Sequence, residues 1–444
     1  MYPIFFSYDS SLISSEKRAN TAERLIEEIN CMNNAATMQY EDDRASINLP
    51  DDKKALKKIK MLVEEKKELK PSYLIVVGIG GSNLGTMAVQ EAILGKLYNQ
   101  LNPNIKVLYA DTVDSDLIND IIKIIEPILK KGENIIINGV SKSGGTTETI
   151  SNFEILVELL KKYRKDYEKY VVVTSDKNSK FWDFSIENRF DVLEIPKKVG
   201  GRYSVFSAVG LFPLGLIGIK IDQLLKGAHD MKNKCLNDNI LENPAAISAT
   251  LIYLHRKKDK NIHDLFLFGN GLESVGKWYR QLMGESIGKE FNKEKKRVFE
   301  GITPTVSIGS VDLHSMAQMY LGGPYDKYTT FINVKHNNSD MIVPDMKEYS
   351  KLVEVIQGKR LKELMDAIVE GVKTAFKKGK RPFSEIILPD KSEYSIGQLL
   401  QFKMMEMMYL GFLLEVNPFD QPNVEDYKSE TRNILESKKV VTSL

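Results

Sequence analysis

Residues 135–149 read Ile-Ile-Ile-Asn-Gly-Val-Ser-Lys-Ser-Gly-Gly-Thr-Thr-Glu-Thr. The first six are mostly apolar and β-branched, which predicts a short buried strand, and the pattern over residues 150–163 favours a helix. A strand that passes through a glycine-containing loop into a helix is the repeating unit of a parallel sheet. Because ligands of such folds lie beyond the carboxyl ends of the strands, this loop is also a place to expect chemistry.

Similar apolar runs precede and follow this segment, with room for a helix between them. They lie at residues 74–78, 107–110, 171–174 and 192–195. A second series follows at residues 265–268, 305–308 and 330–334, with helical stretches at 352–377 and 398–414. This alternation predicts an α/β fold of two domains, each a parallel sheet with helices on both faces.

The composition is that of an ordinary globular protein with almost no charge bias. Lys and Arg number 62 against 60 Asp and Glu, so the formal net charge is +2. This balance argues against nucleic acid or a membrane surface as the main partner, whereas a small anion needs only a local cluster of donors.

Cys31 and Cys235 are too far apart for a zinc or redox motif. The first residues turn polar too soon for an export signal, so we expect a cytoplasmic protein.

The loop at residues 141–149 carries five hydroxyl side chains around two glycines. Hydroxyls and free N–H groups at a helix start suit phosphate oxygens, whereas simple N-capping requires one hydroxyl and not five. Residues 78–85, Gly-Ile-Gly-Gly-Ser-Asn-Leu-Gly, form a second glycine-rich loop. Its spacing does not fit a dinucleotide fingerprint, and a tight turn explains it as well as an anion site does.

Residues 271–277, Gly-Leu-Glu-Ser-Val-Gly-Lys, match most of the nucleotide-binding P-loop. The next residue is Trp278, where that motif needs Ser or Thr to hold magnesium. A nucleotide-hydrolysing function is therefore a poor fit, and Trp278 and Tyr279 are better explained by helix packing.

Four reactive side chains stand in short motifs with turn residues. They are Arg202 in Gly-Gly-Arg-Tyr-Ser (200–204), Glu285 in Gly-Glu-Ser (284–286), His314 in Asp-Leu-His-Ser (312–315) and Lys428 at the end of residues 417–428. An arginine can stabilise an oxyanion, and a carboxylate near apolar surroundings can act as a general base. Each residue also has an ordinary alternative: a surface arginine or glutamate, a structural histidine, or a solvated helix lysine.

Taken in order, these motifs resemble those of phosphoglucose isomerases, particularly the shorter bacterial form, over residues 74–428. The most specific stretches are residues 199–204, 284–286 and 419–428. The resemblance implies two sugar-isomerase domains with flavodoxin-like parallel sheets. It places a helical N-terminal segment at residues 1–60, the smaller domain with the phosphate loop at 61–220, and the larger domain with the base and C-terminal helices at 221–444.

The same resemblance assigns residues to substrate binding. Four residues are expected to hold the phosphate: Ser141, Lys142, Ser143 and Thr146. Gly81 and Ser82 are expected to contact the sugar. The substrate is therefore expected to be a small sugar phosphate that bridges these two loops.

For catalysis, the resemblance implies that Glu285 moves a proton between the first and second carbons of the sugar. Arg202 is expected to stabilise the enediolate, with Gln421 nearby, and His314 and Lys428 to assist ring opening. Active enzymes of the family are homodimers in which the histidine is donated across the interface.

The expected reaction is the reversible conversion of glucose 6-phosphate into fructose 6-phosphate through a cis-enediol, in glycolysis and gluconeogenesis. It needs no hydride acceptor, and the five histidines show no metal-ligand spacing, so neither a cofactor nor a metal is expected. Asn423 departs from the family pattern, which usually has glycine; if the position needs φ > 0, Asn is among the best-tolerated replacements. The alternatives are an isomerase that also accepts mannose 6-phosphate and a module that binds sugar phosphate without turnover.

Overall fold

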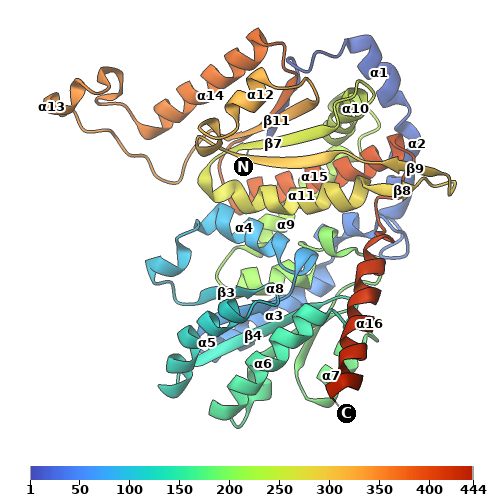
Figure 1. Ribbon diagram of the computed structural model, residues 1–444, viewed down its shortest axis with the longest axis vertical. Helices are drawn as coiled ribbons and strands as arrows, with labels where there is room; N and C mark the ends of the chain where they lie inside the picture. Colours follow the sequence, from blue (N-terminus) through green and yellow to red (C-terminus); the bar gives the residue numbers. More distant parts are fainter. Residues whose placement is uncertain (1, 443–444) are drawn as a thin grey trace.

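The computed structural model describes the backbone of residues 2–442 and the side chains up to residue 437. Two five-stranded sheets lie one above the other, each flanked by helices (Figure 1). The predicted class, α/β with two largely parallel sheets covered on both faces, is confirmed. The domain limits drawn from the sequence stay a prediction.

The first sheet, in the lower half of Figure 1, has the strand order β3-β2-β4-β5-β6, and all of its pairings are parallel. Its strands are β2 (Pro71–Val77), β3 (Lys106–Ala110), β4 (Asn134–Ser141), β5 (Val171–Ser175) and β6 (Asp191–Glu194). All five were predicted from their apolar runs. The chain leaves β2 toward β3 on one side and returns at β4 on the other, so a topological switch point lies between β2 and β4.

Helices cover both faces of the first sheet. They are α3 (Lys53–Glu68), α4 (Leu84–Leu94), α5 (Ser115–Lys130), α6 (Thr147–Tyr163), α7 (Lys180–Glu187) and α8 (Ala208–Leu216). In α5, Ile118, Ile121, Ile125 and Leu129 recur at helical spacing and are all buried. The residues of β4 from 135 to 141 are buried without alternation, as expected for a strand covered on both sides.

The second sheet has the order β1-β12-β11-β7-β10. Its strands are β1 (Phe5–Ser7), β7 (Ile262–Phe268), β10 (Thr303–Gly309), β11 (Lys327–Val334) and β12 (Phe383–Leu388). The apolar runs do not predict β1 or β12. Strand β1 pairs antiparallel with β12, so the N-terminal segment, expected to be helical, also adds an edge strand to this sheet.

Other helices flank the second sheet. They are α1 (Ser15–Glu23), α2 (Ile26–Ala35), α9 (Ile221–Cys235), α10 (Pro244–Arg256), α11 (Glu273–Ile287), α12 (Ala317–Gly322), α14 (Leu361–Lys378) and α15 (Glu393–Leu413). Helix α13 (Lys347–Ser350) lies away from the body of the molecule, and α16 (Val424–Thr442) extends into the half that holds the first sheet (Figure 1). Helix α15 is buried nearly all round and packs against α9, α10 and α11. A hairpin of β8 (Lys289–Phe291) and β9 (Arg297–Glu300) follows α11.

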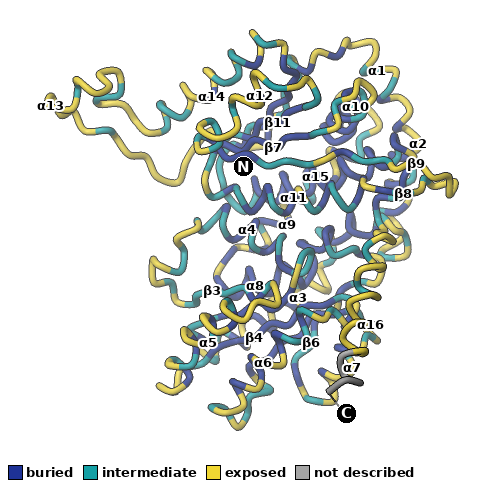
Figure 2. Tube along the Cα trace, viewed as in Figure 1, coloured by how far each residue is buried: buried dark blue, intermediate teal, exposed yellow. Residues whose placement is uncertain are grey.

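The helix expected over residues 352–377 begins only at Leu361. Gly358 has φ +69°, a left-handed conformation that interrupts a helix, and the backbone N–H of Arg360 donates to the Glu363 carboxylate at the helix start. Residues 335–360, here called the arm, instead extend away from the body of the molecule and include α13 (Figure 1). Most of the arm is exposed (Figure 2).

Helix α11 packs against α4 of the first sheet, so it lies where the two halves of the molecule meet. Trp278 and Tyr279 are fully buried in its core-facing side, which agrees with the packing role expected for them. Gly276 lets the helix approach β10, because a Cβ there would lie 2.3 Å from Val306. The last turn of α11 carries Glu285 and contacts the Arg202 segment that follows the first sheet.

Candidate active site

The hydroxyl-rich loop lies between β4 and α6, next to the switch point. The Ser141 and Thr146 hydroxyls are 3.0 Å apart, and the Ser143 hydroxyl is 3.5 Å from that of Thr146. Thr146 occupies the N-cap position of α6, yet its side chain makes no capping hydrogen bond. The hydroxyls therefore gather at a helix start without being used to cap it, which is an arrangement suited to an anion.

Lys142 supplies a positive charge to the same loop. Its side chain is half-buried, and burial lowers its pKa; Asp176 opposes this effect, while the charge of Arg202 adds to it. The influence of Arg202 means that the two cations share one electrostatic environment although they are 60 positions apart in the sequence. The fold thus brings the Lys142 and Arg202 charges near enough to interact.

The glycine-rich loop lies between these segments. Gly80 has φ +59°, which favours glycine, and Gly81 touches the backbone of residues 201–202. A Cβ on Gly81 would lie 2.2 Å from the Gly201 carbonyl carbon, so a side chain there would displace the arginine segment. The Ser204 hydroxyl also donates to the Gly81 carbonyl at 3.3 Å. Gly81 therefore lies directly against the Arg202 segment, and the sugar contacts expected of Gly81 and Ser82 stay a prediction.

Arg202 is buried and fully engaged in hydrogen bonds. Its Nε donates to the Ser286 hydroxyl at 2.8 Å, and Nη1 donates to Gln421 Oε1 at 2.7 Å and to Glu285 Oε2 at 3.2 Å. Nη2 donates to the carbonyls of Pro418 and Asp420 at 2.6 and 3.1 Å. A planar guanidinium with partners on every nitrogen is fixed in orientation. The sequence motifs around 202, 285 and 421 therefore meet at one side chain.

Glu285 is bonded on both carboxylate oxygens but stays open to solvent. Gln281, one helical turn earlier, donates to Oε1 at 3.0 Å, and Arg202 holds Oε2. The Glu285 side chain is 35% exposed, whereas that of Arg202 is 1% exposed. An oriented carboxylate beside a buried cation, reachable from solvent, has the geometry that a general base requires.

Asn423 and Lys428 lie beyond Gln421 and do not join this cluster. The Asn423 side chain donates to Glu290 at 2.8 Å, and its φ is not positive, so this position does not demand glycine. Lys428, in the first turns of α16, pairs with Glu425 on its own helix at 2.7 Å. The structure thus places Lys428 on an exposed helix beside the site, with its ammonium turned toward a neighbouring carboxylate.

His314 lies far from Glu285 within the chain. Gly284 faces Pro304 at the start of β10, whereas His314 follows the other end of that strand. A seven-residue strand spans about 20 Å at roughly 3.3 Å per residue. His314 is exposed on the surface. The fold therefore does not bring this histidine to the Arg202–Glu285 pair of the same chain.

Several residues of the cluster were not predicted from the sequence. They are Gln281, Tyr203, Ser286, Lys289 and Asp420. Gln281 could have been found by helical spacing from Glu285, since side chains four residues apart on a helix are neighbours. Ser286 gives no such signal, because adjacent side chains on a helix do not face each other. Lys289 gives no such signal, because a lysine in the charged run after α11 resembles a solvated surface residue.

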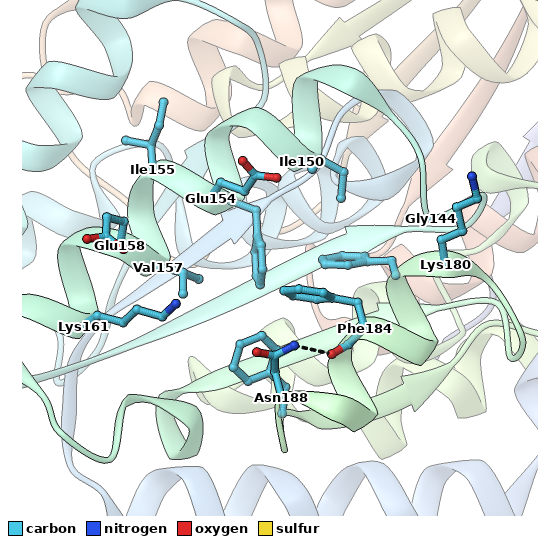
Figure 3. A pocket seen from close by; sticks show the side chains of 13 residues that line it. Gly144, Ile150, Glu154, Ile155, Val157, Glu158, Lys161, Lys180, Phe184 and Asn188 are labelled. Atoms are coloured by element: carbon cyan, nitrogen blue, oxygen red, sulfur yellow. Dashed lines mark hydrogen bonds between the residues drawn. The ribbon is translucent and has the colours of Figure 1, made fainter.

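An apolar groove of about 600 Å³ opens between α6 and α7 and reaches the hydroxyl loop at Gly144. Figure 3 shows Phe184 and Ile150 over the groove, with Lys180 near Gly144 and acidic side chains from α6 along the far edge. The groove lacks the converging hydroxyls and amides of the neighbouring loop. We therefore place the candidate active site at the loops and not in this groove.

The described part of the chain lacks two kinds of feature. Within residues 2–442, no group of three or more His, Cys, Asp or Glu side chains is arranged to hold a metal ion. Among the helices described, none has the length and apolar character needed to cross a membrane.

The fold and the site define an α/β protein with a hydroxyl-lined anion loop beside a bonded arginine–glutamate pair. The phosphoglucose isomerase profile matches residues 6–443, and the chain belongs to this family. The resemblance drawn from the sequence is confirmed. A glucose-6-phosphate isomerase of Carboxydothermus hydrogenoformans is 36% identical over 370 residues, covering 82% of this chain and 78% of the relative. That of Rubrobacter xylanophilus is 31% identical over 439 residues, covering 97% and 98%.

Solved structures resemble the whole chain as well. A hypothetical protein from Thermus thermophilus has a TM-score of 0.85 at 28% identity, covering 97% of this chain and 99% of that one. A glucose-6-phosphate isomerase from Chlamydia trachomatis has a TM-score of 0.83 at 22% identity, covering 98% and 89%. At the latter identity the likeness supports the fold alone.

Proposed function

We propose that this chain interconverts glucose 6-phosphate and fructose 6-phosphate, the activity for which its relatives are named. The observation that carries the proposal is the 3.2 Å contact between Arg202 and Glu285 beside the hydroxyl loop. Aldose–ketose exchange needs a base for a carbon-bound proton and a cation for the oxygen that becomes negative. Both groups are present in one cluster, within reach of an anion loop.

Substrate binding begins at the phosphate. Ser141, Ser143 and Thr146 donate hydroxyl hydrogen bonds to its oxygens, and Lys142 adds positive charge. The first turn of α6 contributes free backbone N–H groups. Gly81 and Ser82 then contact the sugar, which extends from the phosphate loop toward Arg202. In this arrangement residues 61–220 supply the phosphate site and residues 221–444 supply the base.

Proton transfer is the central step. Glu285 takes the proton from the second carbon of open-chain glucose 6-phosphate, and the C–H electrons form the double bond of the enediol. The carbonyl oxygen on the first carbon becomes negative, and the positive charge of Arg202, whose N–H groups are all bonded within the protein, stabilises it through space. Glu285 then returns the proton to the first carbon while a proton passes from the second oxygen to the first. The product is fructose 6-phosphate, and Glu285 is again ionised.

Ring opening falls to His314 and Lys428. Because His314 lies about 20 Å from Glu285 along β10, we infer that it serves the site of a second copy of the chain. The surface around His314 supports such a contact, since Val311, Met316 and Met319 are all exposed there. The arm carries further exposed apolar side chains, including Met341, Leu352 and Val355. A homodimer would cover both surfaces.

The test is turnover by the purified protein. Fructose 6-phosphate is supplied with EDTA present, and glucose 6-phosphate is followed through a coupled dehydrogenase. Glu285→Gln protein, prepared in the same way, controls for isomerase from the expression host. EDTA-resistant turnover that disappears in the variant supports the proposal. Absence of turnover in well-folded wild-type protein contradicts it and favours binding without catalysis, or a different sugar phosphate.

A further inference from the structure

Lys289 is a buried lysine that lies between the two elements that form the Arg202–Glu285 pair. It follows α11 by two residues, and its side chain is 4% exposed. Its ammonium donates to the Glu285 carbonyl at 2.8 Å and to the Asp420 carbonyl, and lies 3.1 Å from the Asp420 carboxylate. Three acceptors match the three N–H donors of the ammonium, so the buried charge is satisfied.

The contact with the Glu285 carbonyl takes the place of a missing helix hydrogen bond. The backbone leaves α11 at Gly288, whose N–H donates to the Gly284 carbonyl, and the next residue enters β8. The Glu285 carbonyl, one of the unpaired groups of the helix end, then accepts from the Lys289 side chain instead. A cation at this position also interacts favourably with the negative end of the helix dipole.

The contact with Asp420 reaches the other half of the site. The same Asp420 carbonyl accepts a hydrogen bond from Arg202, and the next residue, Gln421, accepts another. Burial lowers the pKa of Lys289, and the charge of Arg202 adds to this effect, while Asp420 and Glu285 oppose it. The free-energy cost of burying the Lys289 ammonium next to a second cation must be offset by the hydrogen bonds that it makes.

We propose that Lys289 is a positioning residue that ties the end of α11 to residues 417–421, and so sets how Glu285 and Arg202 face the substrate. The inference rests on the proposed isomerase function. Lys289 does not touch the carboxylate of Glu285; it acts through the backbone on either side of the pair. Misplacing catalytic groups by about 1 Å can cost roughly a hundredfold in rate, so removing this tie should be visible in turnover.

The experiment is a double-mutant cycle between Lys289 and Arg202. Lys289→Met is expected to lower kcat by about tenfold to a hundredfold with KM for fructose 6-phosphate within about twofold, because the phosphate loop belongs to the other sheet. In an Arg202→Lys background, where the positioned guanidinium is gone, the same change should cost less than about threefold. Lys277→Met, which removes an exposed lysine of α11 paired with Glu273, is the matched control and should leave kcat unchanged.

Two outcomes overturn the proposal: wild-type kcat in Lys289→Met, or the same loss in both backgrounds, which would indicate general damage to the fold. If Lys289→Met does not fold, the cycle is run with Lys289→Arg, which keeps the charge but moves the donors. Backbone hydrogen exchange gives a reading independent of turnover. Lys289→Met should speed exchange at residues 417–423 and leave residues 141–149 unchanged; equal protection in both proteins overturns the tie, even if the wild type proves not to be an isomerase.

Discussion

The Arg202–Glu285 pair and the His314 surface differ in how far one chain completes them. Arg202 is buried, holds five partners, and is fixed beside a carboxylate that two side chains orient. His314 lies exposed at the far end of β10, among exposed apolar side chains. The Arg202–Glu285 pair is thus preformed within one chain, whereas the role proposed for His314 would require a second surface.

This difference follows from the free-energy cost of burying each group. A buried guanidinium and a carboxylate must be paired in the folded state, because an unpaired buried charge is strongly destabilising. A histidine at the surface has no such requirement, so the fold can leave His314 exposed. Variants of Glu285 and of His314 can therefore test this difference.

The largest effect is expected at Glu285. Glu285→Gln keeps an oxygen for Arg202 but cannot take up a proton, so kcat should fall by about a thousandfold or more. Binding of the sugar phosphate, measured by calorimetry, should stay within about threefold because the phosphate contacts are unchanged. Near-normal turnover in this variant would show that Glu285 is not the base. The Arg202–Glu285 pair would then be a structural contact only.

The next effect tests whether the His314 region acts across an interface. His314→Ala should lower kcat by about a hundredfold, since general acid–base groups contribute that much. Refolding it in a 1:1 mixture with Glu285→Gln should restore about a quarter of wild-type activity. Half of the dimers are then mixed, and each has one complete site out of two. No recovery in mixtures that contain mixed dimers would place His314 in its own chain's site or outside catalysis.

The strands and the position of the hydroxyl loop could be predicted from the sequence, whereas the side-chain contacts of the site could not. Short β-branched runs such as 135–137 are enough to predict the strands of the first sheet, because a strand covered on both faces leaves an uninterrupted apolar signal. The position of the hydroxyl loop at a strand end followed from the same pattern. The meeting of Arg202 with Gln421 could not be derived, since 219 residues separate them and only the packing of the two sheets brings them together.

Strand β12 and the start of α14 were not predicted correctly, for local physical reasons. In strand β12 the buried polar residues Ser384 and Glu385 interrupt the apolar run, so only the three residues 386–388 remain as a signal. The pattern over residues 352–360 resembles a helix, but Gly358 turns the backbone to positive φ and the helix starts later. The roles of Glu285 and His314 came from the family resemblance and not from spacing; whether they are correct is what the variants decide.

A smaller effect is expected beneath the His314 surface. Asp264 of β7 accepts hydrogen bonds from Thr305, Ser307 and Tyr320, the last of which belongs to α12 just after His314. Burial raises the pKa of Asp264 from 3.8 to about 6. Because the folded-state pKa lies above the unfolded one, this residue contributes stability below about pH 4 that is lost as the pH rises to about 6.

Asp264→Asn removes that titration. The free energy of unfolding of the variant minus that of the wild type, measured by urea denaturation, should therefore rise by about 2 kcal/mol between pH 4 and pH 7. The comparison uses the difference at each pH, so other titrating groups cancel. A difference that does not change with pH would mean that burial does not raise the pKa of Asp264.

The smallest effect is expected at the hydroxyl side chains of the loop, which are preformed like the Arg202–Glu285 pair but are neutral. Ser141→Ala and Thr146→Ala should each raise KM for fructose 6-phosphate about tenfold, with little change in kcat, because each removes one hydrogen bond to a charged phosphate. Thr147→Ala, one residue further on and exposed, is the matched control and should leave KM unchanged. Since the Ser141 and Thr146 hydroxyls lie 3.0 Å apart, the double variant should cost less than the product of the two single effects. Unchanged KM in both single variants would move the phosphate to another place in the fold, and the apolar groove at Gly144, with Lys180 at its edge, would be the next candidate.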